Sequence, residues 1–362
     1  MKRKTLAAAV ATALLMVSIA AMPVSAKQPP PPADPGPTVV ATGLLNPRGL
    51  DFAPNGTLYV AEAGAGGATP ISGTQFIGTT SQISAIDIGG TPGSNVHPVV
   101  TGLISVANAD GTSATGADGL SVQGGRILAI MTGAHQLTDG VPPGAVPLDV
   151  LNAAKAQLGR LIKLNPGGHW TTIGDVGGFD FNYTLTCGAA CDNNSQFPDA
   201  NPYGVLGLPG MTYVADAGAN TLDLVSANGS VQVLAYAHAQ SNDFLGDEVP
   251  TCVAQAGGQL YVGTLNGNVF RYDGTPTLQR VTLTTPPGPP LVSIGGCTGD
   301  AAGNLYLSDQ FGGAVWKVAP GGSTTEIGVV PDPSGIVLGP DGYLYVSQNS
   351  TQTNGQVVRL LP

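Results

Sequence analysis

Residues 48–62 read RGLDFAPNGTLYVAE, and this stretch decides how the rest of the chain is interpreted. A tight Pro-Asn-Gly turn separates two apolar runs, the pattern of two antiparallel strands joined as a hairpin. Five further segments repeat a small residue, mixed apolar positions, a Gly-containing turn and an apolar run: 118–133, 203–216, 250–264, 295–309 and 334–348. The sequence therefore holds six copies of one hairpin, and repeats of this length indicate a repeat architecture.

A third alternating strand is expected after each hairpin, at residues 82–88, 159–165, 220–226, 267–273, 313–319 and 355–361. A fourth is expected in five cases, at residues 98–103, 170–174, 231–236, 278–283 and 324–329. Four strands repeated about a centre are typical of a propeller, because no blade can bury both faces alone. We predict an all-β fold, a six-bladed β-propeller of four-stranded antiparallel blades.

The sixth blade lacks a fourth strand at its own end of the sequence. Residues 38–44 (TVVATGL) resemble the fourth strands at 98–103 and 324–329. Pairing them with residues 355–361 would close the ring and hide two sheet edges. An open β-sandwich with a loose N-terminal arm is the alternative, and the count of six with complementary ends favours closure.

The first residues indicate export. Lys2, Arg3 and Lys4 precede an apolar run at residues 6–21, and Val24-Ser25-Ala26 ends it with small residues. This order predicts a signal peptide at residues 1–26, since the apolar run is shorter than a membrane span. Residues 27–37 (KQPPPPADPGP) are expected to be an extended Pro-rich leader, followed by the propeller at 38–362. We predict a secreted, extracytoplasmic protein with no membrane insertion after removal of the signal.

The composition is typical of an all-β protein with short strands and many turns. The chain has 53 Gly and 30 Pro, with 10% charged and 42% hydrophobic residues. Such a Gly and Pro content also occurs in disordered chains, but the regular Leu-Tyr-Val triplets argue against disorder. Without Lys2, Arg3 and Lys4, ten basic residues face 23 acidic ones, a net charge of −13. That charge repels phosphate backbones, so we expect no nucleic-acid partner.

The longest connections gather on one face of the predicted disc. In a four-stranded meander the second-to-third and fourth-to-first connections share a face, and here they include residues 64–80, 134–158 and 175–202. The turns within the hairpins, on the other face, are short. Residues 149–158 predict a short helix capped by Asp149, expected to be a lid over part of the long-loop face. Because binding sites concentrate on such loops, we expect a ligand to meet that face.

The hairpin pattern resembles NHL and gluconolactonase-type propellers. A closer resemblance is to the ScyD/ScyE family of secreted six-bladed propellers, carried by residues 45–64 (LNPRGLDFAPNGTLYVAEAG), 201–204 (NPYG), 214–220 (VADAGAN) and 249–251 (VPT). The family implies export and this fold but no particular reaction. The fifth blade departs from the pattern, because GGCTGDAAGN at 295–304 replaces a more apolar strand.

The residues before each first strand should ring the mouth of the central channel. We predict a ligand-binding site there, with an unknown small molecule, glycan or protein as partner and the propeller as a monomer. Its candidate residues are Arg48, Asp118, Asn201, Tyr203 and Glu248.

A metal site is a further hypothesis for the same mouth. Carboxylates around a narrow opening could hold Ca²⁺ or another divalent ion, although no cofactor is required by the sequence. Gluconolactonase-like propellers use a Glu, an Asp and Asn residues at comparable positions, and Asp118, Asn201 and Glu248 would be the counterparts. Alternatively, Arg48 and Asp118 pair with each other or cap turns. If the oxygens of Asp118, Asn201 and Glu248 converge, a metal-dependent hydrolase or lactonase becomes the better interpretation.

Other reactive residues give weaker signals. Glu62, Asp216 and Asp309 recur at the ends of second strands, where we expect them to accept N–H groups of the next turn. No nucleophile elbow, zinc-protease motif or phosphate loop is present, and His97, His135, His169 and His238 are scattered. A non-catalytic binding or scaffold protein is therefore favoured over the hydrolase, and a structural surface protein is third.

The four cysteines of an exported chain predict two disulfides. Cys187 and Cys191 share one connection, and Cys252 and Cys297 occupy the same place on the first strands of adjacent blades. The second pair can bridge only if its Cα atoms lie within about 7 Å.

Overall fold

The computed structural model describes residues 36–191, 198–239, 247–284 and 291–362. The signal peptide expected at residues 1–26 lies outside the described residues, as does all of the expected leader except residues 36 and 37. Within the described part, no helix has the length and apolar character that crossing a membrane requires.

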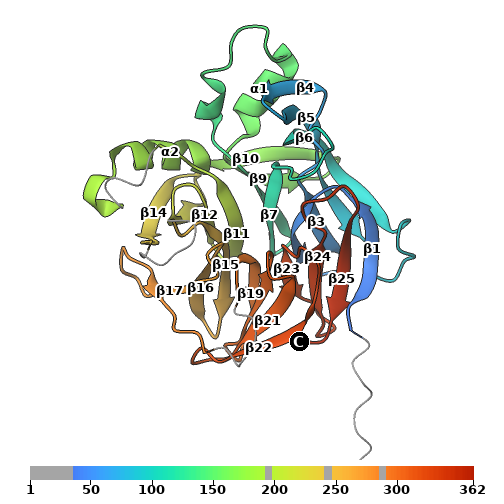
Figure 1. Cartoon of the computed structure of the whole chain (residues 1–362), viewed down its shortest axis with the longest axis vertical. Helices are drawn as coiled ribbons and strands as arrows, with labels where there is room; N and C mark the ends of the chain where they lie inside the picture. The colour runs from blue at the N-terminus through green and yellow to red at the C-terminus, as the bar shows by residue number, and fades with distance from the viewer. Residues whose placement is uncertain (1–35, 192–197, 240–246, 285–290) are drawn as a thin grey trace, which may run out of the picture. The chain divides into compact units, whose positions relative to one another are not determined.

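The six predicted hairpins form the first two strands of six antiparallel sheets, and the chain is a six-bladed β-propeller (Figure 1). The first blade contains β2 (Pro47–Phe52), β3 (Leu58–Glu62), β4 (Thr69–Ser72), β5 (Gln75–Ile86) and β6 (Val96–Asn108). The second contains β7 (Ala117–Gln123), β8 (Arg126–Met131), β9 (Arg160–Asn165) and β10 (His169–Asp175). The third contains β11 (Pro202–Leu208), β12 (Met211–Asp216), β13 (Thr221–Ser226) and β14 (Val231–Tyr236).

The remaining three blades follow the same order. The fourth contains β15 (Pro250–Ala256), β16 (Gln259–Thr264), β17 (Val269–Tyr272) and β18 (Gln279–Arg280). The fifth contains β19 (Ile294–Gly299), β20 (Leu305–Asp309), β21 (Ala314–Val318) and β22 (Thr324–Val329). The sixth contains β23 (Ile336–Leu338), β24 (Leu344–Gln348), β25 (Gly355–Leu360) and β1 (Thr38–Leu44).

The ring closes through β1, as predicted. It pairs antiparallel with β25, with Val39 opposite Val358 and Leu44 opposite Gly355. Leu44 is completely buried in an apolar cluster that also contains Leu58 of the first blade. The N-terminal strand therefore supplies both the fourth strand of the last blade and part of its contact with the first.

The hydrophobic core lies between the blades. Six apolar clusters of the described residues each draw their members from two neighbouring blades, and a small seventh cluster of Ala63, Ala107 and Ala114 lies beside the first blade. The first strand of every blade also contacts the first strands of both neighbours, in a closed cycle around the centre. Blade-to-blade burial is thus what stabilises the ring, because each sheet presents two apolar faces.

The long connections contain more regular structure than the sequence indicated. Residues 64–80, expected as a loop, include β4 and the first half of β5, which pair as a hairpin above the blade. The connection at 175–202 contains α2 (Val176–Thr186) and a short 3₁₀ helix, η2 (Gly188–Ala190), neither of which was predicted. The connection at 134–158 contains a second 3₁₀ helix, η1 (His135–Thr138), and α1 (Leu148–Gln157).

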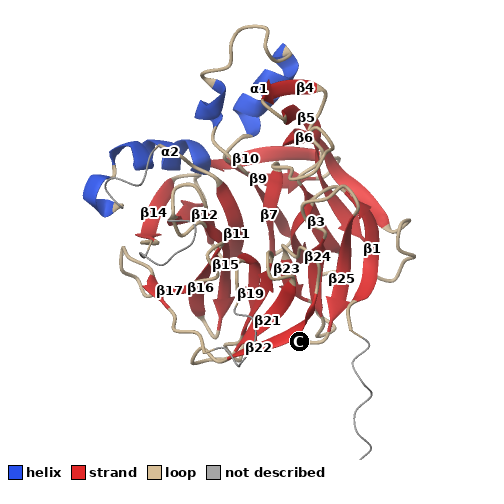
Figure 2. Ribbon diagram, in the orientation of Figure 1, coloured by secondary structure: helices blue, strands red, loops and turns tan. Residues whose placement is uncertain are grey.

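The predicted helix at 149–158 exists as α1, one residue earlier in the chain, and it packs on the first blade. Its cap residue is Pro147, and Asp149 lies in the first turn. α1 packs on β5 and β6, and the Gln157 side chain accepts the Ile104 N–H at 2.7 Å. Figure 2 shows both helices at the periphery, outside the ring of first strands.

Candidate functional site

A cavity of about 300 Å³ occupies the centre of the ring. Its wall draws residues from the first strands of all six blades, together with the residues directly before them. Much of the wall is backbone and aliphatic side chain, including Leu50, Val205, Val253 and Ile336. Polar side chains also line the cavity, including Asp51, Ser121, Gln255 and Thr298.

Glycines let the first strands approach one another closely. A Cβ at Gly119 of β7 would collide with the Tyr203 carbonyl oxygen and lie 2.8 Å from the Val205 nitrogen. A Cβ at Gly204 of β11 would lie 2.8 Å from the Thr251 carbonyl oxygen. Any larger residue would push neighbouring blades apart, so these glycines fix the width of the channel.

Gly119 and Gly204 occupy equivalent positions in their blades, and the residue before this position can be identified on the first strand of every blade. These six residues are Arg48, Asp118, Tyr203, Thr251, Gly295 and Ser334. All except Arg48 line the cavity. They define what we call its long-loop end.

Three of the predicted site residues come together at the long-loop end. Arg48 Nη1 lies 3.3 Å from the Tyr203 hydroxyl, although the two belong to the first and third blades. Arg48 Nη2 donates to the Ala114 carbonyl at 2.7 Å. Asp118 and Ser334 interact with the same tyrosine. We call Arg48, Asp118, Tyr203 and Ser334 the polar cluster.

Burial dominates the electrostatics of the polar cluster. It raises the pKa of Asp118 to about 6, although the charge of Arg48 and a hydrogen bond with Tyr203 both lower it. Burial also raises the pKa of Tyr203 to about 12, with Arg48 acting in the opposite direction. Near pH 7 Asp118 is therefore mostly an ionised acceptor, and Tyr203 is a neutral hydroxyl that can donate or accept.

Exposure increases along the cavity away from the polar cluster. Asp118 and Ser334 are each only 1% exposed, whereas Gln255, at the opposite end of the wall, is exposed. Leu208 and Gly299, which also lie toward the short hairpin turns, are half-buried. We call this the short-turn end. It is the end at which the lining is more accessible to solvent.

Asn201 does not join the polar cluster. Its side-chain oxygen accepts the Gly133 N–H at 3.2 Å, and its own N–H donates to Asp216 Oδ1 at 2.8 Å. These bonds connect the end of the second blade's hairpin to the third blade. Asn201 is therefore placed as a link between blades, outside the residues that line the cavity.

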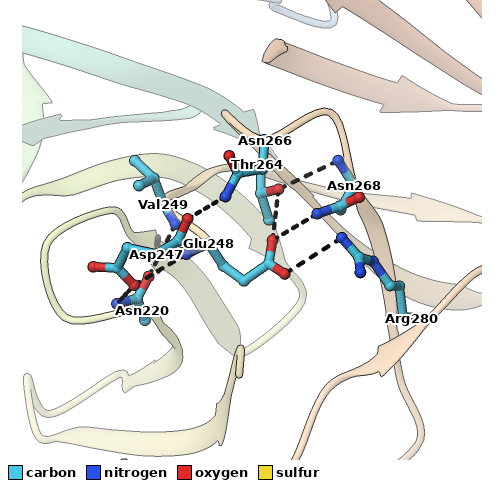
Figure 3. Close-up of polar contacts among 8 residues, drawn as sticks. All are labelled: Asn220, Asp247, Glu248, Val249, Thr264, Asn266, Asn268 and Arg280. Atoms are coloured by element: carbon cyan, nitrogen blue, oxygen red, sulfur yellow. Dashed lines mark hydrogen bonds and ion pairs between the residues drawn. The ribbon is translucent and has the colours of Figure 1, made fainter. Parts of the chain in front are cut away.

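Glu248 does not join the polar cluster either, and Figure 3 shows its carboxylate directed at Thr264, Asn268 and Arg280. Its Oε2 accepts from the Thr264 hydroxyl at 3.1 Å and from Asn268 Nδ2 at 3.0 Å. Its Oε1 lies 3.7 Å from Arg280 Nη2, on the last strand of the fourth blade. These contacts lie on the outer side of the blade.

The backbone explains this outward direction. Val249 has a φ of +56°, a left-handed conformation that is rare for a β-branched residue, and it reverses the chain directly after Glu248. The Asn220 side chain accepts the Val249 N–H at 2.9 Å and also donates to Asp247 (Figure 3).

The convergence of Asp118, Asn201 and Glu248 that the metal-site hypothesis requires is therefore not seen. The three side chains belong to separate hydrogen-bond networks. Across residues 36–191, 198–239, 247–284 and 291–362, no three His, Cys, Asp or Glu side chains are arranged to hold a metal ion.

Thr251 holds the position in the fourth blade that the sequence analysis gave to Glu248. Its hydroxyl lies within hydrogen-bond distance of the Gly263 and Ile294 carbonyl oxygens, so it links the fourth and fifth blades. A local signal would have found it: the ring residue follows a proline at Pro47, Pro202, Pro250 and Pro333. Aligning on these prolines selects Thr251, three residues after Glu248.

The acids at the ends of second strands are structural, as predicted. Asp216 Oδ1 accepts the N–H groups of Gly218 and Ala219, at 2.9 and 2.8 Å. Asp309 likewise accepts the Gly312 N–H at 3.0 Å. For Glu62 the prediction is wrong, because its carboxylate accepts the Leu45 N–H of the preceding connection at 2.8 Å together with the Gln82 and Ser84 side chains of the third strand.

Both predicted cysteine pairs are bridged. The Cα atoms of Cys252 and Cys297 are 5.7 Å apart, and those of Cys187 and Cys191 are 5.8 Å apart. The first bridge joins the inner strands of the fourth and fifth blades and forms part of the cavity wall. Two disulfides indicate an oxidising, extracytoplasmic environment.

Among the scattered histidines, His135 has a charged partner. Its Nε2 lies 3.3 Å from Asp175 Oδ2, and Asp175 also pairs with Arg160. This group lies at the start of α2, outside the cavity wall, and Asp175 additionally caps the helix by accepting the Gly178 N–H at 3.0 Å.

Comparison with known proteins supports the architecture. No family model matches the sequence, and no match is found among curated proteins. A Bacteroides thetaiotaomicron protein of unknown function has a TM-score of 0.57 at 11% identity, over 90% of this chain and 76% of that one.

Two solved structures with named activities are also similar. A protein named as a candidate gluconolactonase has a TM-score of 0.54 at 16% identity, over 91% and 93% of the two chains. A streptogramin B lyase has a TM-score of 0.50 at 13% identity, over 90% and 96%. At these identities the likeness concerns the fold alone: the chain is a six-bladed β-propeller with gluconolactonase-like structural neighbours.

Proposed function

We propose that this protein binds a small polar molecule in its central cavity, with Asp118 and Tyr203 orienting the ligand. The observation that carries the proposal is the polar cluster at one end of a cavity with mainly apolar and backbone walls. Small-molecule sites typically combine an apolar lining with a few convergent polar groups. A volume of about 300 Å³ lies at the lower end of the usual range, so the ligand is small.

The chemistry of the cluster favours a neutral ligand that both donates and accepts hydrogen bonds. Arg48 and Asp118 carry opposite charges and attract each other. Because each charge already has a partner, neither requires a charged ligand. The Tyr203 hydroxyl can donate or accept, and Asp118 only accepts when ionised. Hydroxyl groups of a polyol or sugar, or an amide group, have this combination.

We place the entrance at the short-turn end. Gln255 at that end is exposed and Leu208 is half-buried. In the polar cluster, Asp118 and Ser334 are each 1% exposed, and Tyr203 is half-buried. The long loops, which the sequence analysis favoured as the binding face, project at the periphery instead (Figure 2). The metal-dependent hydrolase gains no support, since its three candidate ligands lie in separate networks.

We further propose that the protein acts outside the cytoplasm as a monomeric member of the ScyD/ScyE family. The two disulfides and the basic-then-apolar start of the sequence support export. The hairpin motif at residues 45–64 supports the family, whose members are propellers of this kind.

A thermal-shift screen tests the binding proposal. Purified protein is screened against sugars, polyols, sugar acids and small amides, and each hit is repeated with Tyr203→Phe, Asp118→Asn and Gln255→Trp. We expect Tyr203→Phe and Asp118→Asn to weaken binding by about tenfold or more, because each removes or alters a buried polar contact. Gln255→Trp should block entry.

The matched control is Leu148→Ala, which changes an exposed side chain of α1 on the long-loop side. It should leave binding unchanged. Hits that are lost in Leu148→Ala but retained in Tyr203→Phe and Asp118→Asn would place the site on the long loops and refute the proposal.

A further inference from the structure

Three aspartates meet in the interior beneath α2. Asp180 comes from the middle of α2, Asp216 from the end of β12 and Asp223 from β13 of the third blade. All three side chains are completely buried. Asp180 is within hydrogen-bonding reach of both of the other carboxyl groups. The helix is therefore joined to the blade through a carboxyl–carboxyl contact.

Four carboxyl oxygens of these aspartates receive no hydrogen bond from an N–H group or a hydroxyl of the described residues. Both oxygens of Asp180, together with Asp216 Oδ2 and Asp223 Oδ1, are buried without a hydrogen-bond partner among the described residues, apart from other carboxyl groups. The remaining oxygens are satisfied: Asp216 Oδ1 by three backbone N–H groups, and Asp223 Oδ2 by the Thr221 hydroxyl at 2.8 Å. Three buried negative charges in contact would be strongly unfavourable, so the group requires neutralisation.

The titratable side chains around α2 do not neutralise the three aspartates. Those on the elements packed against the helix are His135 of η1, Arg160 and Lys163 of β9, Tyr213 of β12, Tyr236 of β14 and Tyr183 of α2 itself. His135 and Arg160 pair with Asp175 at the start of the helix. The groups that act on Asp180 are Asp223 and Asp216, which are both acidic.

We propose that Asp180 keeps a proton at neutral pH and that this shared proton holds α2 against the third blade. The protonated carboxyl of Asp180 donates to a neighbouring aspartate, and the helix loses this bond when the proton leaves. Burial and the two neighbouring carboxylates raise the pKa of Asp180 well above the usual range, in agreement with this assignment. Asp216 is the member that best accommodates a negative charge, since three backbone N–H groups donate to its Oδ1.

The raised pKa of Asp180 determines how the docking of α2 depends on pH. When α2 is docked, Asp180 binds its proton more tightly than when α2 is released into water. Docking is therefore strongest at low pH and weakens as pH rises toward the raised pKa of Asp180. Over that interval the released population should grow by up to about tenfold per pH unit for each proton lost.

Hydrogen exchange of the α2 amides, corrected for the intrinsic pH dependence of exchange, tests the proposal between about pH 5 and about pH 8. The wild-type protein should show progressively faster opening of residues 176–186 as pH rises. Asp180→Asn provides a permanent neutral donor of similar shape, so its opening should vary much less with pH. Asp149→Asn, which changes an exposed carboxyl on α1, should behave like the wild type.

Two further measurements keep the proposal falsifiable even if Asp180→Asn does not fold. The infrared spectrum of the wild-type protein at neutral pH should contain the C=O band of a buried carboxylic acid, and its absence would overturn the proposal. Calcium and EDTA should leave exchange of α2 unchanged. Slower exchange with calcium in the wild type would show that a cation, and not a proton, neutralises the group.

Discussion

Replacing Asp118 by Asn should stabilise the protein at neutral pH, because the native carboxylate is held in an unfavourable environment. The side chain is 1% exposed, and burial raises its pKa from 3.8 to about 6. A carboxyl with a raised folded-state pKa contributes stability below about pH 4 and loses it as pH rises through about 6. A difference of roughly two pKa units corresponds to about 3 kcal/mol. A binding group retained at this cost would be a trade of stability for function.

Urea denaturation of the wild type and Asp118→Asn at several pH values measures this effect. The free energy of unfolding of the variant, relative to the wild type, should rise by about 2 kcal/mol between pH 4 and pH 7, because part of the full change falls below pH 4. Asp149→Asn, at an exposed position, should show no such trend. If the relative stability of Asp118→Asn falls as pH rises, attraction by Arg48 outweighs burial, and the description of the polar cluster is refuted.

Three other substitutions test the architecture. Leu44→Ala should cost about 2–5 kcal/mol in chemical denaturation, since it empties a completely buried position on the strand that closes the ring. Gly119→Ala should lower the melting temperature sharply or prevent folding, because its Cβ would meet the Tyr203 carbonyl. Replacing Cys252 and Cys297 by Ser should cost about 4 kcal/mol, the entropy of a loop closed over a separation of 45 residues.

Each of these changes has a matched control. Val39→Ala, at a 40% exposed position on the same strand, should cost less than about 1 kcal/mol. Gly140→Ala meets no atom within 4 Å and should be neutral. Removing the Cys187–Cys191 bridge should cost about 2 kcal/mol, because its loop is short. Equal effects in Leu44→Ala and Val39→Ala would contradict ring closure through β1, and equal effects of the two disulfides would contradict the chain-entropy argument.

The sequence predicted the repeated strands well because each copy carries its own turn and alternation. The Gly-containing turns are local signals, and six repetitions made the architecture and its closing strand recognisable. The disulfide between Cys252 and Cys297 was predicted from their placement on the first strands of adjacent blades. The structure places Cys297 one residue further along its strand than the position equivalent to Cys252, which is Gly296.

The parts that were missed depend on contacts between blades. The segment that forms α2 contains two glycines and a β-branched residue at its start, and its place is fixed by Asp180 against the third blade. Glu248 was assigned to the channel because it immediately precedes the expected strand. The left-handed turn at Val249 directs it outward, and Thr251 takes its place. The conformation of this single turn removes Glu248 from the candidate metal site.

The most direct test of the proposed binding site is a crystal structure of the protein with the strongest hit from the thermal-shift screen. We predict that the molecule occupies the central cavity, with its polar groups within hydrogen-bond distance of Asp118 and the Tyr203 hydroxyl. A molecule bound on α1 or η1, with no ligand between the first strands, would contradict the central claim.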